Sequence, residues 1–82
     1  MARYYLHLRD GIDELLDPDG QEFADPEALA RGALEAARDV MSGDIMTAGI
    51  VDLRCRIDAE DKDGRVLYSL PFEAAVLIQY HR

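Results

Sequence analysis

The side chains best suited to chemistry in this sequence lie on two segments in which polar and apolar residues alternate. Every second side chain is polar in residues 3–9, and arginine and aspartate take the alternate positions in residues 50–59. If the two segments are neighbouring strands, their polar sides share one face of a sheet. That face gathers a candidate binding site of five residues: Tyr5, His7, Arg9, Arg54 and Arg56. Clustered arginines can bind a phosphate, another anion or an acidic partner.

The same pattern has a purely structural interpretation. The uncovered face of an antiparallel sheet is normally polar. Asp52 and Asp58 alternate with the arginines and are expected to pair with them. We therefore favour the structural interpretation, followed by a protein or self-association surface, and then by an anion or nucleic-acid site.

His7 is the one histidine within a regular segment, and Asp10, three residues later, is placed to orient it from the following turn. A His–Asp pair can transfer protons. No serine or cysteine nucleophile follows at a recognisable spacing, and Cys55 is expected on the opposite, buried face of the sheet. We expect His7 to be hydrogen-bonded on the sheet face, with no catalytic residue, and we expect that the chain is not an enzyme.

Two acidic turns resemble the start of calcium-binding loops: Asp17-Pro18-Asp19-Gly20 and Asp61-Lys62-Asp63-Gly64. The twelve-residue loop requires an acidic or amide side chain at its first position, where alignment on the glycines places Leu15 and Ala59. Both segments are therefore predicted to be turns. One cysteine and two histidines provide no zinc-ligand set, so no metal or cofactor is expected.

The strands and turns that position these residues follow from alternation and from Gly and Pro. Residues 3–9 predict one strand and residues 50–59 another, with its apolar side buried. Asp63-Gly64 favours a hairpin that leads to a third strand over 65–70, which Pro71 ends. Residues 12–24 predict a short, irregular strand or hairpin. The residues expected to be buried by these segments are Leu15, Leu16, Phe23, Val51, Leu53, Cys55, Ile57 and Ala59.

A helix is predicted to begin at Asp25-Pro26, because aspartate caps a helix and proline suits its first turn. Its apolar stripe is Leu29, Ala33, Ala36, Ala37, Val40 and Met41. Ser42-Gly43 predicts the end of this helix, followed by a connection over 44–49. The missing side chain of Gly32 would allow close packing on the sheet. Residues 72–78 predict a short second helix, and residues 79–82 are expected to fray.

Together these elements predict a single α+β domain over residues 1–82. Its architecture is a two-layer sandwich, in which a small antiparallel sheet of three to four strands carries one main helix on one face and a short C-terminal helix. The aliphatic sides of residues 3–9 and 50–59 are expected beneath the main helix. The arginines and His7 are then directed outward.

Composition narrows the possible partners. The 82 residues leave room for one domain, and 17 acidic against 9 basic residues give a formal net charge of −8. That charge argues against non-specific binding to nucleic acid or to an anionic membrane. No apolar run approaches the ~20 residues that span a bilayer, and the start of the chain has no signal-like apolar run. A single cysteine excludes an internal disulfide, so we expect a cytoplasmic location.

Several segments together carry a family resemblance. They are Arg3 to Gly11, Asp17 to Glu22, Asp25 with the Ala-rich stretch from Ala28 to Ala37, Asp63 to Leu67, and Leu70-Pro71-Phe72. The chain resembles a family of small bacterial proteins, catalogued as a domain of unknown function, whose members begin R-Y-[FY]-[FL]-H and carry a late D-G-x-x-L…[VL]-P-F segment. The resemblance implies a compact bacterial domain that usually stands alone. It implies no activity, ligand or catalytic residue.

A looser similarity, at the level of element order, is to the antitoxin half of a bacterial toxin–antitoxin pair of the HicB kind. The Pro-Gly-Cys type segment that precedes the helix in that family is absent here. Our main hypothesis is a non-catalytic protein-interaction domain that self-associates through the open sheet face or an exposed strand edge. The alternatives are an antitoxin-like inhibitor of a partner RNase and a small anion-binding module at Arg9, Arg54 and Arg56.

Overall fold

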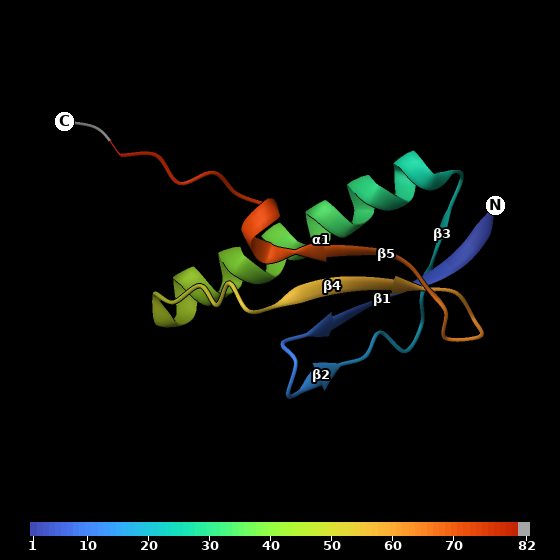
Figure 1. The fold of residues 1–82 in the computed structure, drawn as a ribbon, viewed down its shortest axis with the longest axis horizontal. Helices are drawn as coiled ribbons and strands as arrows, with labels where there is room; N and C mark the ends of the chain where they lie inside the picture. The colour runs from blue at the N-terminus through green and yellow to red at the C-terminus, as the bar shows by residue number, and fades with distance from the viewer. Residues whose placement is uncertain (81–82) are drawn as a thin grey trace.

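A computed structural model describes residues 1–80, in which one long helix lies across a small antiparallel sheet (Figure 1). The α+β prediction is thereby confirmed. The elements in chain order are β1 (Ala2–Arg9), β2 (Glu14–Leu15), β3 (Gln21–Phe23), α1 (Pro26–Ala48), β4 (Arg56–Glu60), β5 (Val66–Pro71) and the 3-10 helix η1 (Phe72–Ala74). No helix within residues 1–80 is long and apolar enough to cross a membrane.

Strand β1 is the hub of the sheet, whose order is β2-β1-β4-β5. On one side, β1 pairs with β4. On the other side, β2 pairs with the C-terminal end of β1, and β3 pairs with the N-terminal end of β1. The segment 12–24, predicted to be an irregular strand or hairpin, thus forms two short strands. Phe23 is buried as predicted, but the prediction for Leu15 and Leu16 is wrong, because they are 70% and 51% exposed. The two-residue strand β2 lies at the outer edge of the sheet, and α1 packs on β3, β4 and β5 instead.

Helix α1 begins where the sequence predicts. The carboxylate of Asp25 accepts the N–H of Ala28 at 2.7 Å, and Pro26 occupies the first turn. The buried residues of the helix are Leu29, Ala33, Ala37 and Met41. A Cβ at Gly32 would lie 2.4 Å from the ring of Phe23 on β3, so the predicted close packing at this glycine is confirmed.

The predicted end of the helix at Ser42-Gly43 is wrong, and so is the connection predicted over 44–49. Helix α1 continues to Ala48, and Gly49 caps it in the left-handed conformation with φ of 69°. The N–H of Gly49 donates to the carbonyls of Asp44 and Ile45. A glycine inside a helix costs only about 1 kcal/mol, so Gly43 lowers the stability of the helix without ending it.

Strand β4 begins later than predicted and ends later. The segment before it turns at residues 53 and 54, because the carboxylate of Asp52 binds both the N–H and the guanidinium of Arg54. Side-chain hydrogen bonds of this kind compete with a sheet ladder. Leu53 is consequently 41% exposed, so its predicted burial is wrong, while Ile57 and Ala59 are buried beneath α1 as predicted. Cys55 is half-buried and packs against the same core.

The hairpin between β4 and β5 is confirmed. The carboxylate of Asp61 organises its turn by accepting the N–H groups of Asp63 and Arg65. The helix predicted over 72–78 is reduced to η1, because residues 76–80 belong to no regular element. Figure 1 shows this last segment running away from both layers. Of the residues expected to fray, 81 and 82 lie outside the described residues.

Candidate functional site

The open face of the sheet brings together four of the five predicted site residues. Tyr5, His7 and Arg9 on β1 lie opposite Glu60, Asp58 and Arg56 on β4, respectively. Arg54 is the exception, because it lies in the turn before β4. Its side chain is 74% exposed and pairs with Asp52 at 2.8 Å. The prediction that Arg54 shares the open sheet face is therefore wrong.

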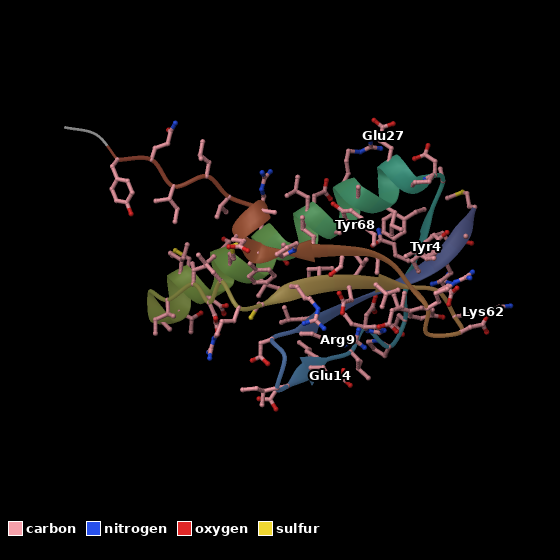
Figure 2. The ribbon with its side chains drawn as sticks, in the orientation of Figure 1. Tyr4, Arg9, Glu14, Glu27, Lys62 and Tyr68 are labelled. Carbon is pink, nitrogen blue, oxygen red and sulfur yellow. The ribbon has the colours of Figure 1, made fainter. Side chains whose placement is uncertain are left out.

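Two buried carboxylates form the centre of this face. Asp58 and Glu60 are 3% and 8% exposed, although they lie on the side that α1 does not cover. The guanidinium of Arg9 donates to both of them and, at 2.9 Å, to Glu14 on β2. Figure 2 labels Arg9 and Glu14, which lie beside each other on neighbouring strands. No sequence pattern singles out Glu60, because it falls just beyond the alternating segment.

Asp58 receives further donors from its own strand and from β5. Arg56 donates to it at 3.1 Å and the hydroxyl of Ser69 on β5 at 2.6 Å. Burial acts to raise the pKa of Asp58, but the hydrogen bonds from Ser69 and Arg9 and the charge of Arg56 outweigh it and hold that pKa below its ordinary value. The predicted pairing of aspartates with the arginines is confirmed, so this face is a closed network of opposite charges.

His7 is held by two contacts that the sequence did not indicate. Its Nδ1 accepts the backbone N–H of Asp17 at 3.0 Å, and its Nε2 lies 3.6 Å from a carboxylate oxygen of Glu60. Tyr5 stacks beside it with ring centroids 6.3 Å apart. The expectation that Asp10 orients His7 is wrong, because the carboxylate of Asp10 instead accepts N–H groups within its own turn.

Asp17 joins the loop between β2 and β3 to the middle of β1. Its carboxylate accepts the N–H of Leu6 at 3.3 Å, and also those of Asp19 and Gly20. Partial burial acts to raise the pKa of Asp17, but these three hydrogen bonds outweigh it, so the net shift is downward. One aspartate thus replaces the strand pairing that β1 lacks between β2 and β3.

The chemistry available to this network is limited by its own contacts. Both ring nitrogens of His7 face structural partners, and Nδ1 must be unprotonated to accept from Asp17. Cys55 packs toward the core, where burial raises the pKa of its thiol, and a thiol is a poor nucleophile until it is deprotonated. Among residues 1–80, no group of three or more His, Cys, Asp or Glu side chains could hold a metal ion.

A second candidate surface is the outer edge of β5. The sequence predicts an exposed strand edge but singles out no residues for it. The N–H of Phe72 donates to the carbonyl of Cys55 at 3.0 Å, and Pro71 faces Arg56 in the next pair. Because hydrogen-bonded and non-hydrogen-bonded pairs alternate along an antiparallel ladder, the backbone groups of Pro71 and Ser69 point away from β4. Among the described residues, no strand accepts these groups.

An apolar groove borders this edge on the helix side. It has a volume of about 350 Å³ and runs between α1 and β5. Ala30 and Leu34 of α1 line one wall, and Tyr68 and Leu70 of β5 line the other. Figure 2 shows Tyr68 on β5 facing the helix, with Glu27 near the start of α1. The free backbone edge and the groove are therefore two parts of one surface.

Comparison with known proteins identifies a family for the chain but no similar curated protein or solved structure. A family model described as a domain of unknown function (DUF6894) matches residues 3–73. No curated protein and no solved structure matches the chain.

Proposed function

The chain belongs to this family of unknown function, and we propose from its own geometry that it is a non-catalytic, cytoplasmic protein-interaction domain that self-associates through the edge of β5. The observation that carries the proposal is the outward N–H and C=O of Ser69 on an unpaired edge strand. Such an edge is a template for another strand.

A second copy offers a matching edge. When two β5 strands pair antiparallel about Ser69, each Ser69 donates its N–H to the carbonyl of Ser69 in the other copy, which is the self-complementary arrangement of a two-fold dimer. Pro71 removes no bond to β4, because its missing N–H faces the edge, but it leaves the carbonyl of Leu67 in the other copy without one donor of the new ladder. The product is one continuous sheet formed by both copies.

The side chains around the edge support pairing on both faces. Val66 and Leu67 are 47% and 46% exposed at the start of β5, and the groove containing Leu34 and Tyr68 lies directly beside the strand. Placing two such edges together covers these apolar groups, and burial of apolar area contributes about 25 cal/mol per Å². The pairing of strands therefore brings a hydrophobic contribution as well as hydrogen bonds.

The open face has a different role in this proposal. Arg9 and Arg56 each bind a carboxylate of the same face, so little unpaired positive charge is left there for an anion. The contacts of His7 and Cys55 described above support a non-catalytic role. The single free Cys55 suits a reducing compartment. We assign the network to holding β1, β4 and β5 in register.

The test compares Ser69→Pro with Ser69→Ala by analytical ultracentrifugation over a range of concentrations. Both variants lose the hydroxyl bond to Asp58, but only proline removes the outward N–H and adds bulk at the edge. We expect a wild-type dimer, a dimeric Ser69→Ala and a monomeric Ser69→Pro, with circular dichroism verifying that each is folded. A wild-type monomer at every concentration, or a Ser69→Pro variant that dimerises as well as Ser69→Ala, would overturn the proposal.

A further inference from the structure

The segment that follows η1 is an apolar arm with no cover of its own. We call residues 76–80 the C-terminal arm; Leu77, Ile78 and Tyr80 in it are 81%, 61% and 88% exposed. The arm has no charged residue. In Figure 1 it leaves the body of the molecule beside α1 and continues outward. Large apolar side chains exposed together commonly mark an interaction site.

The point from which the arm departs is fixed. Phe72 and Ala75 are each 1% exposed in the core, and the side chain of Arg38 donates to the carbonyl of Ala75 at 2.9 Å. The arm therefore starts at a defined place, just beyond the end of β5.

The dimer proposed above brings this origin to a particular place on the second copy. In an antiparallel pairing of the two β5 strands, the end of one lies beside the start of the other. Figure 1 shows that α1 and β5 both start at the same end of the molecule. Each arm thus emerges next to the first turns of α1 in the other copy, where Glu27, Ala30 and Arg31 border the groove.

We propose that the C-terminal arm of each copy lies in the α1–β5 groove of the other copy. This inference rests on the proposed self-association through β5. Five extended residues span roughly 16 Å, which exceeds the roughly 10 Å of helix between Glu27 and Leu34. Alternation along an extended chain puts Val76, Ile78 and Tyr80 on one side and Leu77 and Gln79 on the other. The side with three apolar residues contacts Ala30, Leu34 and Tyr68.

The exchange of arms explains how so short an edge supports a stable contact. Specific interfaces usually bury about 1,200–2,000 Å² in total, and β5 has only 6 residues. The two arms add three large apolar side chains from each copy. They also cover the grooves that border the two-fold axis, so the whole contact is continuous.

A pair of arm variants tests this inference in the full-length chain. Ile78→Asp places a charge on the side that faces the groove, and Gln79→Asp places the same charge on the opposite side. We expect Ile78→Asp to weaken the dimer by about tenfold or more, because a desolvated charge opposes docking, and Gln79→Asp to change the dissociation constant by less than about twofold. Sedimentation equilibrium measures both constants.

The outcomes separate this inference from the proposal on which it rests. If Ile78→Asp dimerises as tightly as the wild type while Ser69→Pro is monomeric, the arm exchange is overturned and the β5 pairing stands. If the wild type itself is a monomer, both are overturned.

Cysteine cross-linking locates the groove. Mixing an Ile78→Cys chain with an Ala30→Cys chain under oxidising conditions should give a mixed disulfide dimer, whereas Gln79→Cys mixed with Ala30→Cys should give much less. Equal yields from the two mixtures would contradict the predicted seating of the arm.

Discussion

The backbone N–H of Asp17 donates to Nδ1 of His7 at 3.0 Å. The loop that contains Asp17 forms no ladder with β1, so this bond from the His7 ring helps to hold it against the strand. His7→Ala leaves this half-buried N–H without an acceptor, which costs about 1–2 kcal/mol. His7→Asn keeps an acceptor oxygen near the same position and should lose less. Urea unfolding measures both free energies, and equal losses would contradict the role given to this bond.

A pH prediction follows from Asp58. Its pKa in the folded protein lies below the ordinary 3.8, so its contribution to stability is complete above that value and is lost as the pH falls through the folded pKa. Asp58→Asn should lower the free energy of unfolding by about 2–3 kcal/mol at neutral pH, since Arg9 and Arg56 lose a charged acceptor.

Asp58→Asn should also make the free energy of unfolding less dependent on pH in the acid range. Between about pH 5 and about pH 3, the wild type should lose stability more steeply than Asp58→Asn, because the variant has one fewer group that binds a proton on unfolding in acid. Urea unfolding repeated at several pH values gives the two slopes. Parallel slopes would argue against the lowered pKa of Asp58.

The contact between Gly32 and Phe23 predicts an unfavourable alanine. Alanine improves helix propensity by about 1 kcal/mol, but its Cβ would lie 2.4 Å from the Phe23 ring. We expect a net loss of about 1–2 kcal/mol for Gly32→Ala, since overpacking costs more than the propensity returns. In a Phe23→Leu background the same substitution should cost less, and thermal unfolding of the four proteins measures the difference. Additive effects would mean that the two residues do not meet.

The two glycines near the end of α1 predict opposite signs. Gly43 lies inside the helix with open space around its missing side chain, so Gly43→Ala should stabilise by up to about 1 kcal/mol. Gly49 has a positive φ, so Gly49→Ala should destabilise by about 1 kcal/mol. Thermal unfolding compares them. If Gly43→Ala were destabilising and Gly49→Ala stabilising, the helix would end at Gly43, as the sequence pattern predicts.

The sequence predicted the parts of this fold that depend on local pattern. Alternation located β1, the cap at Asp25 located the start of α1, and the Asp63-Gly64 turn located the hairpin. The helix end was missed because Gly43 and Gly49 both precede plausible connections, and only tertiary context selects between them. The strand at 50–55 was missed because one side chain, that of Asp52, closes a local turn there.

The candidate site was predicted in outline for similar reasons. Period-two alternation puts His7 and Arg9 on one face of β1, and burial of the apolar side of each strand puts Arg56 on the same face of the sheet. Which strand lies opposite, and therefore that Glu60 faces Tyr5 and approaches His7, depends on pairing between residues more than fifty positions apart. The loop contact from Asp17 and the outward direction of Ser69 depend on other tertiary contacts, between His7 and the loop and between β4 and β5. No local pattern encodes either of them.

Hydrogen exchange at the amide of Ser69 tests the self-association claim most directly. We predict that this amide, which points away from β4, exchanges slowly at protein concentrations at which the dimer forms, and quickly when the protein is diluted to the monomer. The neighbouring amide of Leu70 points toward β4 and serves as the internal reference, protected at both concentrations. Fast exchange of the Ser69 amide at every concentration, with the Leu70 amide protected throughout, would contradict the pairing of β5 with a second copy.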